Sequence, residues 1–127
     1  MKAGSADVVI VGAGAIGCSI ARELARRGLD VIAVERDSPG RAATWAAGGM
    51  LSPLGVGNDG PFLELADASL RGFAPFAESL RSETGIAVEY RTSGMLHVSL
   101  GDADDALRAI AAQPAAARFD VTRVDGA

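Results

Sequence analysis

A glycine pattern near the amino terminus constrains the fold more than any other feature of the chain. Residues 12–17 read GAGAIG, a G-x-G-x-x-G pattern that follows a continuous β-branched run at Val8–Val11. Continuous apolarity predicts a strand buried on both faces, as in a parallel sheet. From Ile16 to Arg27, apolar residues recur at three- and four-residue spacings, which predicts a helix. The glycines therefore lie at a turn between a strand and a helix.

A second strand completes a β-α-β unit. Gly28 follows the helix, where a left-handed cap is expected, and Val31–Val34 is another continuous apolar run. Residues 7–35 match the ~30-residue length of such a unit, whose crossover is right-handed. The sequence therefore predicts an α/β fold that opens with a Rossmann-like β-α-β unit.

The positions of the glycines indicate a dinucleotide site. Gly12 allows a tight turn, Gly14 lets the backbone approach a pyrophosphate, and Gly17 lets the helix pack close to the sheet. Glu35 follows Gly17 by 18 residues, near the ~20 typical of the acidic residue that accepts from ribose hydroxyls. A carboxylate there would repel a 2′-phosphate, which disfavours NADP. The spacing leaves open NAD, FAD and a β-α-β unit that binds no nucleotide.

The segment after Glu35 differs in composition. Residues 36–60 contain six glycines and two prolines, together with apolar residues such as Met50 and Leu51. A glycine-rich stretch of this length inside a compact domain is typical of disorder or of a loop that wraps a ligand. Its apolar residues favour the loop. A short helix is predicted at 42–47.

Beyond residue 60 the pattern predicts helices with short strands between them. A helix or helix pair is expected at 61–83, with a kink or break at Pro75. Further predicted elements are strands at Ala87–Tyr90 and Met95–Leu100 around a turn at 91–94, a helix at 103–112 capped by Asp102, and a weak strand at Phe119–Val124.

Composition excludes several classes of protein. With one cysteine there is no intramolecular disulfide and no CxxC metal site, and a reducing cytoplasm is the expected location. A net charge of −4 disfavours a nucleic-acid surface. No apolar run reaches the ~18 residues of a membrane span.

No side chain stands out as a catalytic acid or base, and no metal site is expected. Cys18 is interpreted as a small buried packing residue and Trp45 as packing for its loop. His97 is interpreted as a solvated or half-buried strand residue. The cluster Asp102, Asp104 and Asp105 suits a helix amino terminus better than a cation site.

Residues 7–35 followed by 43–53 (ATWAAGGMLSP) resemble the amino-terminal part of the D-amino-acid-oxidase-like FAD-dependent oxidoreductases. Within that family the chain is most similar to the glycine oxidases of thiamine biosynthesis. Gly48 is a small departure, because Ala is common there. The resemblance implies non-covalent FAD. It places the pyrophosphate at Gly12, Gly14, Ala15, Ile16 and Gly17, with Ala43 and Thr44 beside it. It places the adenosine ribose at Glu35 and the adenine end at Arg36. The isoalloxazine ring would lie along Gly48, Gly49 and Met50.

The resemblance also implies an activity. Similar enzymes oxidatively deaminate glycine or another small amine or amino acid by moving a hydride from the substrate Cα to flavin N5. Oxygen is the expected acceptor, and an imine or oxo acid, ammonia and H2O2 are the products. The alternatives are a D-amino-acid dehydrogenase, a sarcosine-oxidase-like enzyme, an NAD-dependent dehydrogenase and a non-catalytic dinucleotide-binding fragment.

Two parts of the chain are distinguished by these patterns. Residues 1–60 are expected to be the first part of the FAD-binding domain, and 61–127 a helical segment with the start of an α+β substrate-side region. A β-α-β start alone does not make a stable doubly wound sheet. The expectation is therefore an incomplete fold, an amino-terminal fragment that is inactive alone, with a homo-oligomer left open for the full-length protein.

Overall fold

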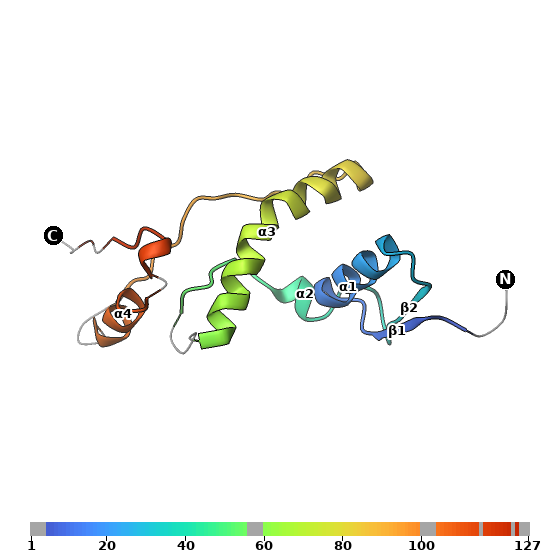
Figure 1. The fold of residues 1–127 in the computed structure, drawn as a ribbon, viewed down its shortest axis with the longest axis horizontal. Helices are drawn as coiled ribbons and strands as arrows, with labels where there is room; N and C mark the ends of the chain where they lie inside the picture. The colour runs from blue at the N-terminus through green and yellow to red at the C-terminus, as the bar shows by residue number, and fades with distance from the viewer. Residues whose placement is uncertain (1–4, 56–59, 100–103, 115, 123, 125–127) are drawn as a thin grey trace. The chain divides into compact units, whose positions relative to one another are not determined.

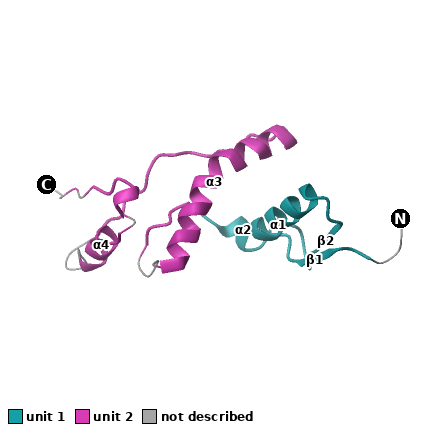
Figure 2. Ribbon diagram, viewed as in Figure 1, with its two compact units in different colours: residues 1–50 teal, residues 51–127 magenta. Residues whose placement is uncertain are grey.

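The computed structural model describes residues 5–55, 60–99, 104–114, 116–122 and 124. The chain forms two compact units, residues 1–50 and residues 51–127, which Figure 2 colours separately. The predicted domain ranges 1–60 and 61–127 stay predictions. None of the described helices combines the length and the apolar character needed to cross a membrane.

The first unit is the predicted β-α-β unit with a short helix after it. Strand β1 (Val8–Val11) leads through helix α1 (Ala15–Arg26) to strand β2 (Val31–Val34), and helix α2 (Ala43–Ala46) follows. The two strands are parallel. Figure 1 shows α1 lying along the strand pair. The α/β class and the parallel start are therefore confirmed, and α2 lies within the predicted range 42–47.

Local sequence explains where α1 ends. Gly28 has a φ of 83°, a left-handed conformation that favours glycine. Its N–H donates to Ala25 O at 3.0 Å, while the N–H of Leu29 donates to Leu24 O at 3.2 Å. These two bonds form a Schellman motif, which satisfies the last carbonyls of the helix. The chain is thereby turned toward β2.

The strands are covered on one face only, so the prediction of burial on both faces is wrong. Val9 and Val11 are 59% and 87% exposed, and they pair in register with the exposed Ile32 and Val34. The reason is that, among the described residues, α1 is the helix that packs on this strand pair, and it contacts the opposite face. We call these four residues the bare sheet face.

The predicted apolar stripe on α1 is also partly exposed. Ile16 and Ile20 are 78% and 47% exposed. Half-buried positions of the helix include Gly17, Ala21 and Leu24, which lie four and three residues apart and so share one face. This narrower face is the one that meets the strands.

The second unit is helical. Helix α3 (Gly60–Thr84) runs through Pro75 without a break, and Figure 1 shows it changing direction along its length, as a proline kink does. Helix α4 (Asp104–Ala111) and the 3-10 helix η1 (Ala116–Arg118) follow. A small core of Leu54, Leu63 and Ile110, with Phe119 against it, joins these elements.

The predicted strands of this unit are wrong where the structure describes them. Residues 87–90 and 95–99 are not strands, and the described part of 119–124 holds none. Short apolar runs form strands only beside a partner strand, and the described residues of this unit provide none. Instead Tyr90 packs on Phe73 of α3, with ring centroids 5.4 Å apart. Leu100 and the predicted cap Asp102 lie outside the described residues, as does the start of the helix predicted at 103.

Candidate functional site

Three hydrogen bonds fix the glycine turn between β1 and α1. The N–H of Gly12 donates to Val34 O at 2.8 Å, which continues the pairing of the two strands. The N–H of Ala13 donates to Glu35 Oε2 at 2.8 Å, and the N–H of Gly40 donates to Ala13 O at 2.9 Å. Both polar groups of the Ala13 backbone are thus satisfied, and this residue is buried.

The three glycines of the pattern differ in what they make possible. Gly12 has a φ of 102°, which other residues rarely adopt. A Cβ on Gly14 would lie 3.0 Å from Thr44 Oγ1. A Cβ on Gly17 would overlap the carbonyl oxygen of Gly12, so only glycine lets α1 pack this closely on the turn.

The amino terminus of α1 is capped from a distant part of the sequence. The first amides of a helix lack intrahelical partners, and they carry its partial positive charge. The N–H of Ala15 donates to Thr44 Oγ1 at 2.9 Å, across 29 residues. Because this hydroxyl acts as acceptor there, its own proton can be donated to another group. Thr44 thus adds a potential donor for an anion at the helix terminus.

Glu35 lies directly after β2, with both carboxylate oxygens accepting backbone N–H groups. Oε2 accepts from Ala13, while Oε1 accepts from Arg36 at 2.8 Å and from Asp37 at 3.3 Å. These amides, the Ala13 amide first, hold the pKa of the Glu35 carboxyl below its ordinary value, and the nearby Arg36 charge adds to the effect. The side chain therefore carries a negative charge beside the glycine turn.

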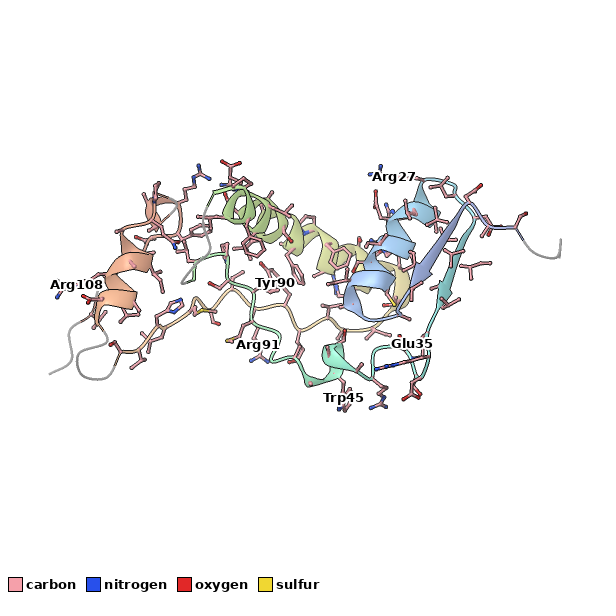
Figure 3. All side chains as sticks on the ribbon, turned by 90° about the horizontal axis from the view of Figure 1, so that it is seen from below. Arg27, Glu35, Trp45, Tyr90, Arg91 and Arg108 are labelled. Atoms are coloured by element: carbon pink, nitrogen blue, oxygen red, sulfur yellow. The ribbon has the colours of Figure 1, made fainter. Side chains whose placement is uncertain are left out.

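An arginine and a tryptophan stack in the loop that carries Thr44. The Arg41 guanidinium carbon lies 4.2 Å from the centre of the Trp45 ring, a cation–π contact. Trp45 thus contacts a residue of its own loop, as predicted, although 70% of its surface is exposed. Glu35 and Trp45 are both labelled in Figure 3. Arg41 lies before α2, so the spacing rule for side chains on one helix does not predict this contact.

The loop after α2 offers backbone without side chains. A Cβ on Gly48 or Gly49 would meet nothing within 4 Å, and Gly49 has a φ of 71°. Met50 is 79% exposed. The three residues that were predicted to contact a flat ring are therefore accessible within the first unit.

Two other candidates carry no site. Cys18 is exposed, which corrects the prediction of a buried packing residue, because it lies off the half-buried face of α1. His97 is exposed and lies outside any strand. Among the residues that the structure describes, no group of three or more metal-ligating side chains comes together.

The first unit thus brings together six of the twelve predicted site residues. Gly12, Gly14, Ala15, Gly17, Glu35 and Thr44 are linked by the bonds and close approaches described above. The structure adds Ala13 and Gly40, which the sequence analysis missed; nothing in the sequence marks their mutual hydrogen bond. A capped helix terminus beside a fixed carboxylate fits an anion that is bonded to a diol, as in a nucleoside diphosphate.

Comparison with known proteins gives one consistent result. The family described as FAD dependent oxidoreductase (DAO) matches residues 7–127. A glycine oxidase from Pseudomonas aeruginosa is 43% identical over 105 residues, which is 82% of this chain and 29% of that protein. The bifunctional protein ThiO/ThiG from a Synechocystis species is 38% identical over 95 residues, 72% of this chain and 14% of that protein.

A solved structure agrees with these sequences. The crystal structure of glycine oxidase from Bacillus cereus matches with a TM-score of 0.69 and 36% sequence identity. The match covers 80% of this chain and 28% of that one. The chain therefore spans less than a third of the length of the two glycine oxidases to which it is compared.

Proposed function

This chain belongs to the DAO family of FAD-dependent oxidoreductases, and we propose that its first unit binds the ADP part of FAD without a covalent link. The single observation that carries the proposal is the α1 amino terminus, where Gly14 leaves room for Thr44 to cap Ala15, next to the charged Glu35. This arrangement offers amide and hydroxyl donors to a diphosphate and a carboxylate to a ribose.

Each predicted site residue has a proposed place in this complex. The turn residues Gly12, Gly14, Ala15, Ile16 and Gly17 face the pyrophosphate, where the helix terminus favours negative charge. Ala43 and Thr44 add donors to the same group. Glu35 accepts from the ribose hydroxyls, and Arg36 lies beside the adenine. Gly48, Gly49 and Met50 follow the isoalloxazine ring, whose approach is eased by the lack of side chains at the glycines.

We further propose that the protein oxidises glycine or another small amine or amino acid, in thiamine biosynthesis, with oxygen as acceptor. The similarity to glycine oxidases and to a ThiO/ThiG protein supports this. When bound, FAD would supply the chemistry by accepting a hydride from the substrate Cα. The residues of this chain bind and orient the cofactor, and we assign none of them as a catalytic acid or base.

The test is a visible absorbance scan of the protein expressed from its natural gene. We expect flavin bands that bleach when glycine is added without oxygen, and release of the flavin into solution on acid denaturation. Bands that resist glycine but bleach with a bulkier D-amino acid would contradict the substrate and keep the cofactor. Flavin that stays attached after denaturation would contradict non-covalent binding, and a protein free of flavin that reduces NAD would overturn the assignment.

A further inference from the structure

One of the three hydrogen bonds that fix the glycine turn comes from a side chain. The bonds of Gly12 with Val34 and of Gly40 with Ala13 join backbone groups, so neither of them involves a side chain. The bond from Ala13 N to Glu35 Oε2 spans 22 residues in sequence and depends on the carboxylate. Ala13 is 7% exposed, and the carboxylate of the exposed Glu35 is the side-chain acceptor that its amide has in the structure.

We propose that Glu35 is a positioning residue for the phosphate-binding turn, in addition to its place as the acceptor for a ribose. This inference rests on the proposed binding of the ADP part of FAD. The affinity for the diphosphate therefore depends on Glu35 even when the ligand has no ribose hydroxyl. Glu35 thereby couples the two halves of the nucleotide site.

The carboxylate has the capacity for both tasks. An ionised carboxyl has about four lone-pair sites on its two oxygens. Oε1 accepts from the amides of Arg36 and Asp37, and Oε2 accepts from Ala13. One site remains on Oε2 for a ribose hydroxyl, so binding a ribose does not require release of Ala13.

The turn depends on this bond because the phosphate donors follow Ala13 directly. The peptide after Ala13 leads to Gly14 and Ala15, where the backbone meets Thr44. Without Glu35, the Ala13 amide loses the acceptor that it has in the structure. The turn would then shift to reach water, and the donors at the start of α1 would move with it.

Asp7 provides a matched control at the opposite end of the strand pair. Its Oδ2 accepts from the N–H of Asp30 at 2.8 Å, across 23 residues. The Asp7→Ala variant thus removes a carboxylate–amide bond of the same length and similar span, which also ties the β1 side to the β2 side. It leaves the glycine turn untouched.

The experiment first frees the wild-type protein, Glu35→Ala and Asp7→Ala of flavin. It then measures their affinity for two probes, ADP and 2′,3′-dideoxy-ADP, by calorimetry. With the dideoxy probe, which has no ribose hydroxyl, we expect Glu35→Ala to bind about tenfold more weakly than wild type. Asp7→Ala should match wild type with both probes. Equal affinity of wild type and Glu35→Ala for the dideoxy probe would show that Glu35 acts on the ribose alone and would overturn the inference.

A second measurement separates this inference from the proposed function. Hydrogen exchange of the Ala13 amide is followed without ligand, and we expect it to be about tenfold faster in Glu35→Ala than in wild type or Asp7→Ala. If wild type binds no ADP, the proposed function fails while the exchange result still decides whether Glu35 holds the turn. Unchanged exchange in Glu35→Ala overturns the inference.

Glu35→Gln serves if the alanine variant does not fold. The Gln side chain has the shape of Glu but has one acceptor oxygen, so it can accept from Ala13 or from the amides of Arg36 and Asp37, not from both. We expect exchange of Ala13 and affinity for the dideoxy probe between those of wild type and complete loss. Faster exchange of the Ala13 amide in Glu35→Gln without weaker binding of the dideoxy probe would contradict a positioning role.

Discussion

Gly17 shows how one missing Cβ decides the geometry of the site. Glycine in a helix interior usually costs about 0.5–1 kcal/mol relative to alanine. Gly17 is nevertheless required, because a Cβ would overlap the carbonyl oxygen of Gly12. Backbone on both sides of this contact cannot move apart without separating α1 from the turn.

Replacement of Gly17 by alanine should therefore destabilise the protein even though it improves helix propensity. The matched control is Gly72→Ala in α3, where a Cβ would meet nothing within 4 Å, and which we expect to be stabilising by about 0.5–1 kcal/mol. Urea unfolding followed by circular dichroism compares the two. A Gly17→Ala protein as stable as Gly72→Ala would contradict the close packing.

Thr44 is the second residue whose exact chemistry matters. Thr44→Val keeps the shape of the side chain but removes the hydroxyl that accepts from Ala15 at 2.9 Å. The variant lacks the hydroxyl proton that Thr44 can donate to a diphosphate. Such a hydrogen bond contributes about 1 kcal/mol, so we expect about a fivefold lower affinity for ADP. Thr44→Ser keeps the hydroxyl and should bind as wild type does. The prediction fails if Val and Ser variants bind ADP equally.

A third prediction concerns how the contribution of Glu35 to stability depends on pH. The pKa of Glu35 is held below the ordinary value of a glutamate by the amides of Ala13, Asp37 and Arg36, in that order, and by the Arg36 charge. Because the pKa is lower in the folded state, the ionised carboxylate stabilises the fold at pH values above the unfolded pKa. This stabilisation is lost as the pH falls through the folded pKa. Unfolding measured from pH 7 downward should show a component below the unfolded pKa that Glu35→Gln lacks. Identical dependence of unfolding on pH in wild type and Glu35→Gln would contradict this prediction.

At the scale of elements, α3 and η1 are held together by a buried charge. Asp67 is 5% exposed and accepts from Arg71, four residues along the helix, at 2.8 Å. The same oxygen accepts from Arg118 of η1 at 3.2 Å. The first contact is local to α3, whereas the second joins parts of the chain 51 residues apart.

This difference predicts unequal effects of two arginine substitutions. Arg118→Met should expose the segment from α4 onward to proteolysis, because it removes the ion pair between η1 and α3. Arg71→Met should have a smaller effect, because its partner lies in the same helix and keeps Arg118. Limited proteolysis with identification of the cut sites tests this, and equal cutting of both variants near η1 would contradict it.

Helices were more predictable than strands in this chain, for a physical reason. The signals for α1 and α2 are local, since the Gly28 cap and the spacing of apolar residues act within a few residues. The parallel β1–β2 pair was recoverable because its connecting helix was recognisable. Residues 87–90 and 95–99 have strand-like composition but no partner strand among the described residues. A local sequence pattern cannot show whether a partner strand is present.

In the candidate site, too, local features could be predicted from the sequence and contacts between distant segments could not. Gly12, Gly14 and Gly17 were found because their spacing is itself the signal. The Thr44 cap on Ala15 and the bond from Gly40 to Ala13 join segments about 27 to 29 residues apart, so no short pattern contains them. The predicted packing of Trp45 within its loop is a contact with Arg41 that leaves most of the ring exposed, and the sequence did not indicate this exposure.

At the scale of the whole molecule, the chain consists of two compact units, and the proposed site lies in the first. A ligand that binds only the folded site slows the opening of the structure around it. We therefore expect ADP to slow hydrogen exchange in residues 8–46 and to leave α3 and α4 unchanged. Protection that spread equally into α4 would place ligand contacts outside the first unit.

The bare sheet face has a practical consequence for handling the chain in solution. Val9, Val11, Ile32 and Val34 put four β-branched side chains on one exposed surface, and the two-stranded pair has open edges. Such a surface promotes colloidal association. Salting-out anions such as sulfate should strengthen this association and cooling should weaken it, because hydrophobic contacts respond in this way to salt and temperature. We therefore expect the bare sheet face to contribute to association of the chain in solution.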